Sequence, residues 1–229
     1  KANLTSRMAE CHWKIAQAYD ELDDHVMAAE HFCLAGENFK SAEEKIPQLK
    51  SFYQDQALYM QAWGEVEKAR HNHERQEYGL AKEHFEKAAE LHKSLKRWSY
   101  LVPNYSAWAQ VEDAEELSRR EQSEEAIIAF EHASKLFTET KKSVQAQFSK
   151  IEDDDEKHMA TSIIKASATR DEYCGARVAL EEAKILDKKG DHFASSRKYG
   201  LAAETFDKIY KTLESEQERK EFQSIISLS

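Results

Sequence analysis

The stretch "AAEHFCLAGENF", residues 28–39, places the small residues Ala28 and Ala35 on either side of Phe32, at spacings of four and three residues. These spacings keep all three side chains on one face of an α-helix. Two small residues allow a neighbouring helix to approach closely, and the ring between them fills the remaining gap. The stretch therefore predicts a helix that packs tightly against a second helix.

The same small–aromatic–small spacing occurs three more times along the chain. The further copies are Ala81, Phe85, Ala88; Ala126, Phe130, Ala133; and Ser195, Tyr199, Ala202. An alanine stands twelve residues before the first residue of every copy, at Ala16, Ala69, Ala114 and Ala183. Self-similarity of this kind is typical of repeat architectures, in which each unit is a helix, a turn and a second helix. We expect four repeat-like units near 8–41, 61–94, 106–139 and 175–208.

The composition favours an all-α fold. The 229 residues include only 6 Gly and 2 Pro, and 33% of them are charged, as in long solvent-facing helices. We expect helices near 4–21, 24–44, 48–75, 77–97, 105–121, 123–150, 157–189, 191–213 and 215–227. Gly190 is expected to end one helix in a left-handed conformation, Asp191 to cap the next, and Ser123 with its following acids to begin another. We treat 1–229 as a single domain, with the acidic segment 152–156 as a candidate internal boundary.

The repeated unit resembles the tetratricopeptide repeat (TPR) family, and the first copy is also similar to the variant repeats of α-SNAP-type adaptors. The fourth copy, "VALEEAKILDKKGDHFASSRKYGLAAETF", carries the resemblance most fully. The copies depart from the family in spacing, since they begin at residues 28, 81, 126 and 195, whereas TPR units repeat every ~34 residues. The resemblance implies a TPR-like α-solenoid of antiparallel helix pairs with unusually long helices.

In TPR arrays the first helices line a concave face that binds peptides, and the resemblance carries this role to the first helix of each unit here. Trp and Arg are common hot-spot residues of interfaces, and three of the four tryptophans fall on this face. The alternative for each residue is packing between repeats or a solvated charge. The residues expected to line a partner-binding groove are Trp13, Trp63, Arg70, Trp108, Arg177 and Lys184.

Several chemistries lack their sequence motifs. The chain has no His-Glu-x-x-His, no phosphate-binding Gly-rich loop and no nucleophile elbow, so we expect no enzyme activity, no cofactor and no metal. The net charge of −10 argues against nucleic acid as a partner. Three separated cysteines indicate reduced thiols and a cytoplasmic location, and no apolar run is long enough to span a membrane.

We therefore expect a non-enzymatic scaffold that binds a peptide or protein partner. The alternative is an oligomerisation or regulatory arm of a larger multidomain protein whose effector domain is absent from this segment, for which self-association is expected. The missing initiator Met fits that alternative. The two differ in oligomeric state, because the stability of a self-associating arm depends on its concentration.

Overall fold

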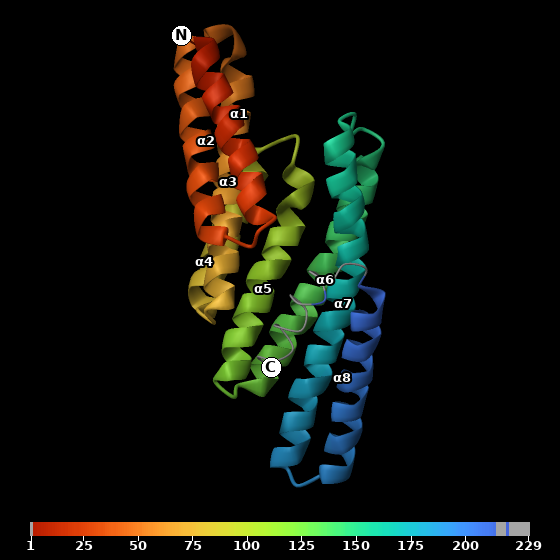
Figure 1. Ribbon diagram of the computed structural model, residues 1–229. Coiled ribbons are helices and arrows are strands. Elements are labelled where there is room, and N and C mark those ends of the chain that lie inside the picture. Colours follow the sequence, from red (N-terminus) through yellow and green to blue (C-terminus); the bar gives the residue numbers. More distant parts are fainter. Residues whose placement is uncertain (1, 214–218, 220–229) are drawn as a thin grey trace. The chain divides into compact units, whose positions relative to one another are not determined.

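The structure is a computed structural model and describes residues 2–213 and residue 219. These residues form eight α-helices and two short 3₁₀ helices, with no β-strand among them. The α-helices are α1 (Ala2–Asp20), α2 (His25–Lys45), α3 (Lys50–Glu74), α4 (Tyr78–Ser94), α5 (Val102–Arg119), α6 (Ser123–Phe148), α7 (Asp154–Lys188) and α8 (His192–Thr212), and the 3₁₀ helices are Pro47–Leu49 and Ser99–Leu101 (Figure 1). The all-α prediction is confirmed.

The predicted helix ends agree closely with the observed ones. The largest differences are three residues, for example at Val102 against the expected 105 and Asp154 against 157. The predicted ends at Gly190 and Asp191 are confirmed, since Gly190 has a φ of 81° and the Asp191 carboxylate accepts a hydrogen bond from the Ala194 N–H at 3.0 Å. The ninth expected helix, 215–227, lies outside the described residues apart from residue 219.

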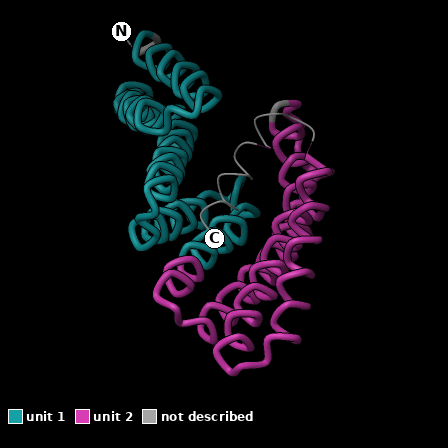
Figure 2. The backbone as a smooth tube through the Cα atoms, turned by 60° about the horizontal axis from the view of Figure 1, so that its bottom comes forward, with its two compact units in different colours: residues 1–112 teal, residues 113–229 magenta. Residues whose placement is uncertain are grey.

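The chain divides into two compact units, residues 1–112 and 113–229, and the division falls within α5 (Figure 2). In unit 1, α2 packs against both α1 and α3, and α3 packs against α4. In unit 2, α7 packs against both α6 and α8. The acidic segment 152–156, our candidate boundary, lies inside unit 2 and leads from α6 into α7.

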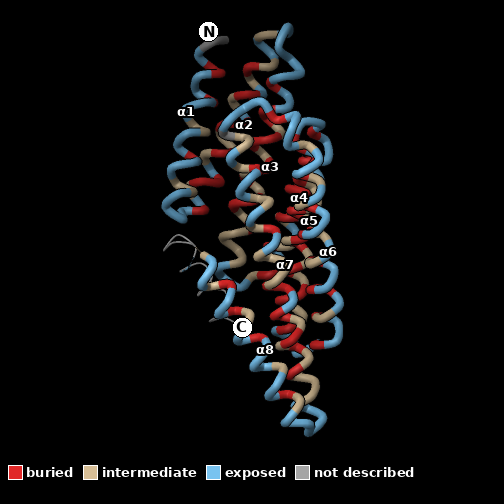
Figure 3. Tube along the Cα trace, turned by 90° about the vertical axis from the view of Figure 1, so that its right-hand side faces the viewer, coloured by how far each residue is buried: buried red, intermediate tan, exposed pale blue. Residues whose placement is uncertain are grey.

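The core of each unit includes most of the repeated small and aromatic residues. All four first-helix alanines are fully buried: Ala16, Ala69, Ala114 and Ala183. The rings of Phe32, Phe85 and Phe130 are at most 4% exposed, so these copies pack as the spacing predicts. The fourth copy differs, because the Tyr199 ring is 41% exposed while its small neighbours Ser195 and Ala202 are buried. The buried residues form stripes along the helices, as Figure 3 shows.

Two glycines explain how closely α2 and α3 approach. A Cβ atom at Gly36 would lie 3.2 Å from the backbone oxygen of Ala57, and one at Gly64 would lie 3.2 Å from the Cys33 sulfur. Both distances are shorter than ordinary van der Waals contacts, so a side chain at either position would require its neighbour to shift by a few tenths of an ångström. This close contact fixes the register of α3, which carries much of the site described below.

Candidate functional site

An aromatic cluster in unit 1 surrounds Tyr59 of α3. The ring of Trp98, from the connection before α5, stacks on Tyr59 at a centroid distance of 4.2 Å. Trp13 of α1 and Trp63 of α3 each meet Tyr59 edge-on, at 6.4 and 6.2 Å. Tyr59 and Trp98 are buried, whereas Trp13 and Trp63 are part-exposed. We call Trp13, Tyr59, Trp63 and Trp98 the Tyr59 cluster.

The local sequence explains why Trp63 has a fixed position. Tyr59 and Trp63 are four residues apart, so they occupy neighbouring turns on one face of α3. Gly64 brings α2 close enough for Phe32 to stack on Trp63, with the ring centroids 5.9 Å apart. The exposed part of Trp63 therefore belongs to a side chain held between two rings, which lowers the entropy that binding would cost.

His92 of α4 contacts this cluster through Tyr59. Its ring is fully buried, stacks on Tyr105 at a centroid distance of 4.8 Å and meets Tyr59 at 6.0 Å. Within the described residues, neither ring nitrogen of His92 has a hydrogen-bond partner. Burial lowers the pKa of His92 to about 4, because a charged imidazole would lose its hydration here. His92 is therefore neutral at physiological pH.

A group of charged side chains lies on the same face of α1 and α3 as Trp13 and Trp63. Arg70 of α3 donates hydrogen bonds to Asp20 of α1 and to Glu67, the latter at 3.3 Å. The carboxylate of Glu67 is fully buried and also contacts His25 Nδ1 at 2.8 Å. His25 Nε2 lies 3.4 Å from the exposed carboxylate of Glu74. We call these five residues the Arg70 group.

Three members of the Arg70 group have the chemistry of metal ligands. One atom each of Asp20, His25 and Glu67 lie within 4.8 Å of one another, close enough to hold an ion. However, the guanidinium of Arg70 bonds both carboxylates and neutralises much of their charge. A metal ion at this position would have to displace Arg70, so the present arrangement favours an internal ion-pair group.

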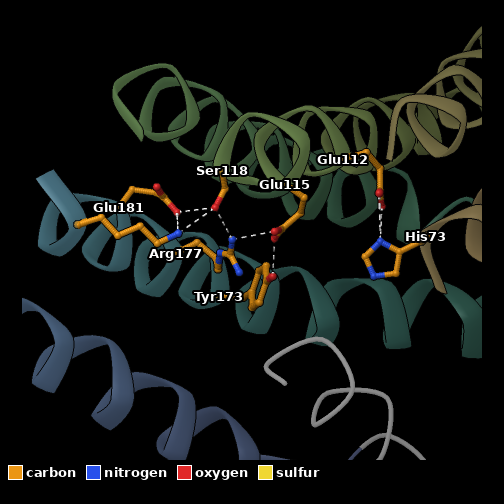
Figure 4. A network of polar contacts seen from close by, with 8 residues as sticks. His73, Glu112, Glu115, Ser118, Tyr173, Arg177 and Glu181 are labelled. Carbon is orange, nitrogen blue, oxygen red and sulfur yellow. Dashed lines mark hydrogen bonds and ion pairs between the residues drawn. The ribbon is translucent and has the colours of Figure 1, made fainter. Parts of the chain in front are cut away.

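Unit 2 contains a buried polar network between α5 and α7 (Figure 4). Arg177 is 1% exposed, and its guanidinium lies 2.7 Å from the Glu115 carboxylate and 5.1 Å from the centre of the Phe130 ring. The Tyr173 hydroxyl donates to Glu115 at 2.8 Å. Burial raises the pKa of Tyr173 well above its ordinary value, and the Glu115 charge raises it further. Tyr173 therefore stays protonated as a donor.

The same network continues to Glu181 of α7. The Ser118 hydroxyl donates to the Glu181 carboxylate at 2.6 Å, and Lys184 Nζ lies 2.7 Å from the same oxygen. Burial acts to raise the pKa of Glu181, but the hydrogen bonds from Lys184 and Ser118 outweigh it and hold the pKa below its ordinary value. Glu181 is thus an ionised acceptor that fixes α7 against α5.

Unit 1 has a comparable contact between α3 and α5. The His73 Nδ1 atom lies 2.9 Å from one oxygen of Glu112 and 3.0 Å from the other, and Glu112 is 1% exposed (Figure 4). Trp108 of α5 stacks on Phe85 of α4 at a centroid distance of 5.9 Å. Within unit 1, α3 thus meets the part of α5 up to Glu112 through a side-chain contact.

The six residues predicted to line a groove lie in different surroundings in the structure. Trp13 and Trp63 come together around Tyr59, and Arg70 lies two turns beyond Trp63 on α3. Arg177 is a correction, since a side chain that is 1% exposed and paired with Glu115 does not line an open groove.

The other two predicted residues are committed to contacts within their own unit. Trp108 packs on Phe85, and Lys184 bonds Ser118 and Glu181. Sequence reasoning missed Tyr59 and Trp98. The four-residue spacing between Tyr59 and Trp63 was a usable signal, whereas Trp98 sits in a connection without periodicity.

The three cysteines differ in burial: Cys11 is exposed, Cys33 is part-buried and Cys174 is buried. This residue is fully buried, and burial raises the pKa of its thiol far above the ordinary value. A thiol that stays protonated is a poor nucleophile, so Cys174 acts as a small apolar side chain in the core of unit 2.

Comparison of the chain with protein-family models, with curated proteins and with solved structures finds no match. The helices of the described residues are also not apolar enough over a sufficient length for any of them to cross a membrane.

Proposed function

We propose that this protein is a non-enzymatic interaction module, a divergent TPR-like α-solenoid of antiparallel helix pairs that binds a peptide or protein segment on unit 1. The observation that carries the proposal is the placement of two part-exposed tryptophans, Trp13 and Trp63, edge-on to the buried Tyr59. Tryptophan offers a large apolar area, and side chains already fixed by packing lose little entropy on binding.

The contacts between first helices support the repeat interpretation. In unit 1, Asp20 of α1 bonds Arg70 of α3, and His73 of α3 bonds Glu112 of α5. In a TPR-like array the first helices of successive repeats lie next to one another, and second helices cover them on one side. The buried alanines of α1 and α3, Ala16 and Ala69, allow the second helices to pack closely.

The charges beside the Tyr59 cluster suggest what the partner segment carries. Asp20 stands seven residues after Trp13 on α1, which is about 10 Å along a helix. Within the Arg70 group, the carboxylates of Asp20, Glu67 and Glu74 outnumber the guanidinium of Arg70, and the side chains of Asp20 and Glu74 are 33% and 54% exposed. We therefore propose a segment with an apolar or aromatic anchor and a Lys or Arg placed about 10 Å from it.

Selection of displayed peptides on the immobilised wild-type protein tests this proposal. Selected peptides should combine the apolar anchor with a basic residue, and Trp63→Ala should weaken their binding by about 30-fold, the effect of a hot-spot tryptophan. The matched control is Phe193→Ala, which removes a ring that is 77% exposed on α8 and should leave binding unchanged. Selected peptides that bind Trp13→Ala and Trp63→Ala as tightly as wild type would overturn the proposal.

A second candidate function is self-association. The observation that favours it is a row of exposed apolar residues along α1, on the side of the helix away from Trp13.

A further inference from the structure

The exposed side of α1 carries apolar residues at alternating steps of four and three. This is the spacing of the a and d positions of a coiled coil, in which a second helix covers the stripe. We call this row, which covers about 27 Å at 1.5 Å per residue, the α1 stripe. Its members are Leu4, Met8, Cys11, Ile15, Ala18 and Leu22, the last in the turn that follows the helix.

The α1 stripe is uncovered within the described residues. Leu4 is 64% exposed, Met8 44%, Ile15 40% and Leu22 74%, and Cys11 and Ala18 are also exposed. The opposite side of α1 packs on α2, where Ala9 and Ala16 are fully buried, and Figure 3 shows this difference between the two sides of the helix. A continuous row of apolar side chains that is exposed on a helix commonly marks a surface that another helix binds.

We propose that a second copy of this chain covers the α1 stripe, with the two α1 helices running antiparallel. In this alignment Leu4 meets Leu22 of the second copy, Met8 meets Ala18 and Cys11 meets Ile15, and each pair occurs twice. Large side chains then face small ones in the inner layers, which fills the seam evenly. A parallel alignment would instead place Ala18 against Ala18 and leave a gap at that layer.

The charges beside the stripe favour the same direction. The exposed residues along one flank are Arg7, Lys14 and Glu21, seven residues apart. In an antiparallel pair these flanks face each other, so Arg7 of each copy meets Glu21 of the other. Lys14 meets Lys14 at the two-fold axis, where solvent and salt screen the repulsion. In a parallel pair the same flank would face His12 and Tyr19, which offer no carboxylate.

This inference deepens the second candidate function, self-association, and does not depend on the proposal that unit 1 binds a peptide. Trp13 lies on the opposite side of α1 from the stripe, so the pairing does not cover the exposed part of Trp13. The seam between the two α1 helices is short, which limits the affinity of the dimer. Because α2 already holds α1 in place, little order has to be gained on pairing, and we expect a dimer that forms reversibly as the concentration rises.

Sedimentation equilibrium of the 229-residue protein tests the pairing. The apparent mass should rise with concentration from 26.5 kDa towards twice that value, while Met8→Glu/Ile15→Glu should remain at 26.5 kDa throughout. The matched control is Ile128→Glu, at a position 67% exposed on α6, which should dimerise like wild type. A wild-type mass of 26.5 kDa at every concentration, or dimerisation of the double variant, would overturn the proposal.

A charge exchange tests the direction. Arg7→Glu alone should raise the dissociation constant of the dimer several-fold, because it places two acids together at both ends of the seam. Arg7→Glu/Glu21→Arg should restore the wild-type constant in an antiparallel dimer. Failure of the double exchange to recover any affinity would exclude the antiparallel arrangement.

Discussion

Replacing Arg177 with methionine is expected to destabilise unit 2 by about 3–5 kcal/mol. The guanidinium lies 2.7 Å from Glu115, a gross attraction of about 6 kcal/mol at an effective dielectric constant of 20, most of which offsets the cost of burying both charges. Glu115 is only 7% exposed, and without Arg177 its carboxylate keeps Tyr173 as its donor in the network. The loss of stability therefore comes mainly from leaving the Glu115 carboxylate buried without its guanidinium partner. Arg177→Met/Glu115→Leu, which removes both charges, should recover at least half of the loss.

The position of the tryptophans makes this measurement specific to one unit. All four lie in unit 1, at residues 13, 63, 98 and 108, so tryptophan fluorescence reports unit 1 while far-UV circular dichroism reports both units. In urea, Arg177→Met should shift the circular dichroism transition and leave the fluorescence transition in place. A loss below about 1 kcal/mol, typical of a surface substitution, would refute the reasoning. An equal shift of both transitions would contradict separate unfolding of the two units.

Three further predictions concern stability. Since burial lowers the pKa of His92 from 6.5 to about 4, the unfolded chain binds a proton that the folded chain does not, so unit 1 should lose up to about 3 kcal/mol as pH falls between these values. His92→Leu should abolish that dependence in fluorescence-monitored urea unfolding, and an unchanged pH slope would contradict it. Phe130→Ala should cost about 3–5 kcal/mol by circular dichroism, whereas Tyr199→Ala should cost less than about 1; equal losses would show that the fourth copy packs like the third. Gly190→Ala should cost about 1–2 kcal/mol because its φ is 81°, and no change in the urea midpoint would exclude that strain.

The helices could be predicted from the sequence because their signals are local. The small–aromatic–small spacing places Ala28, Phe32 and Ala35 on one buried face, and all three are at most 2% exposed. We expected this helix to begin near residue 105, yet α5 begins at Val102, because Pro103 is well suited to the first turn of a helix. The exposure of Tyr199 could not be predicted, since it depends on how α7 and α8 meet rather than on the spacing within α8.

The candidate site was less accessible to sequence reasoning. Trp13 and Trp63 were identified from their helix positions, but Tyr59, which holds them together, belongs to no repeat position. Arg177 was expected in a groove because arginine is usually exposed or at an interface. Its burial follows from Glu115, 62 residues earlier in the chain, and such long-range pairing leaves no trace in local spacing.

The most direct test of the central claim is capture of a binding protein from an extract of cells that make this chain, followed by titration of the purified partner. The baits are wild type, the folded variant Trp13→Ala/Trp63→Ala and the control Phe193→Ala. The account predicts a partner that binds wild type and the control with equal affinity and the double variant at least 30-fold more weakly, the effect of a lost hot spot of about 2 kcal/mol. A partner that binds all three proteins equally would contradict the claim that unit 1 binds through the Tyr59 cluster.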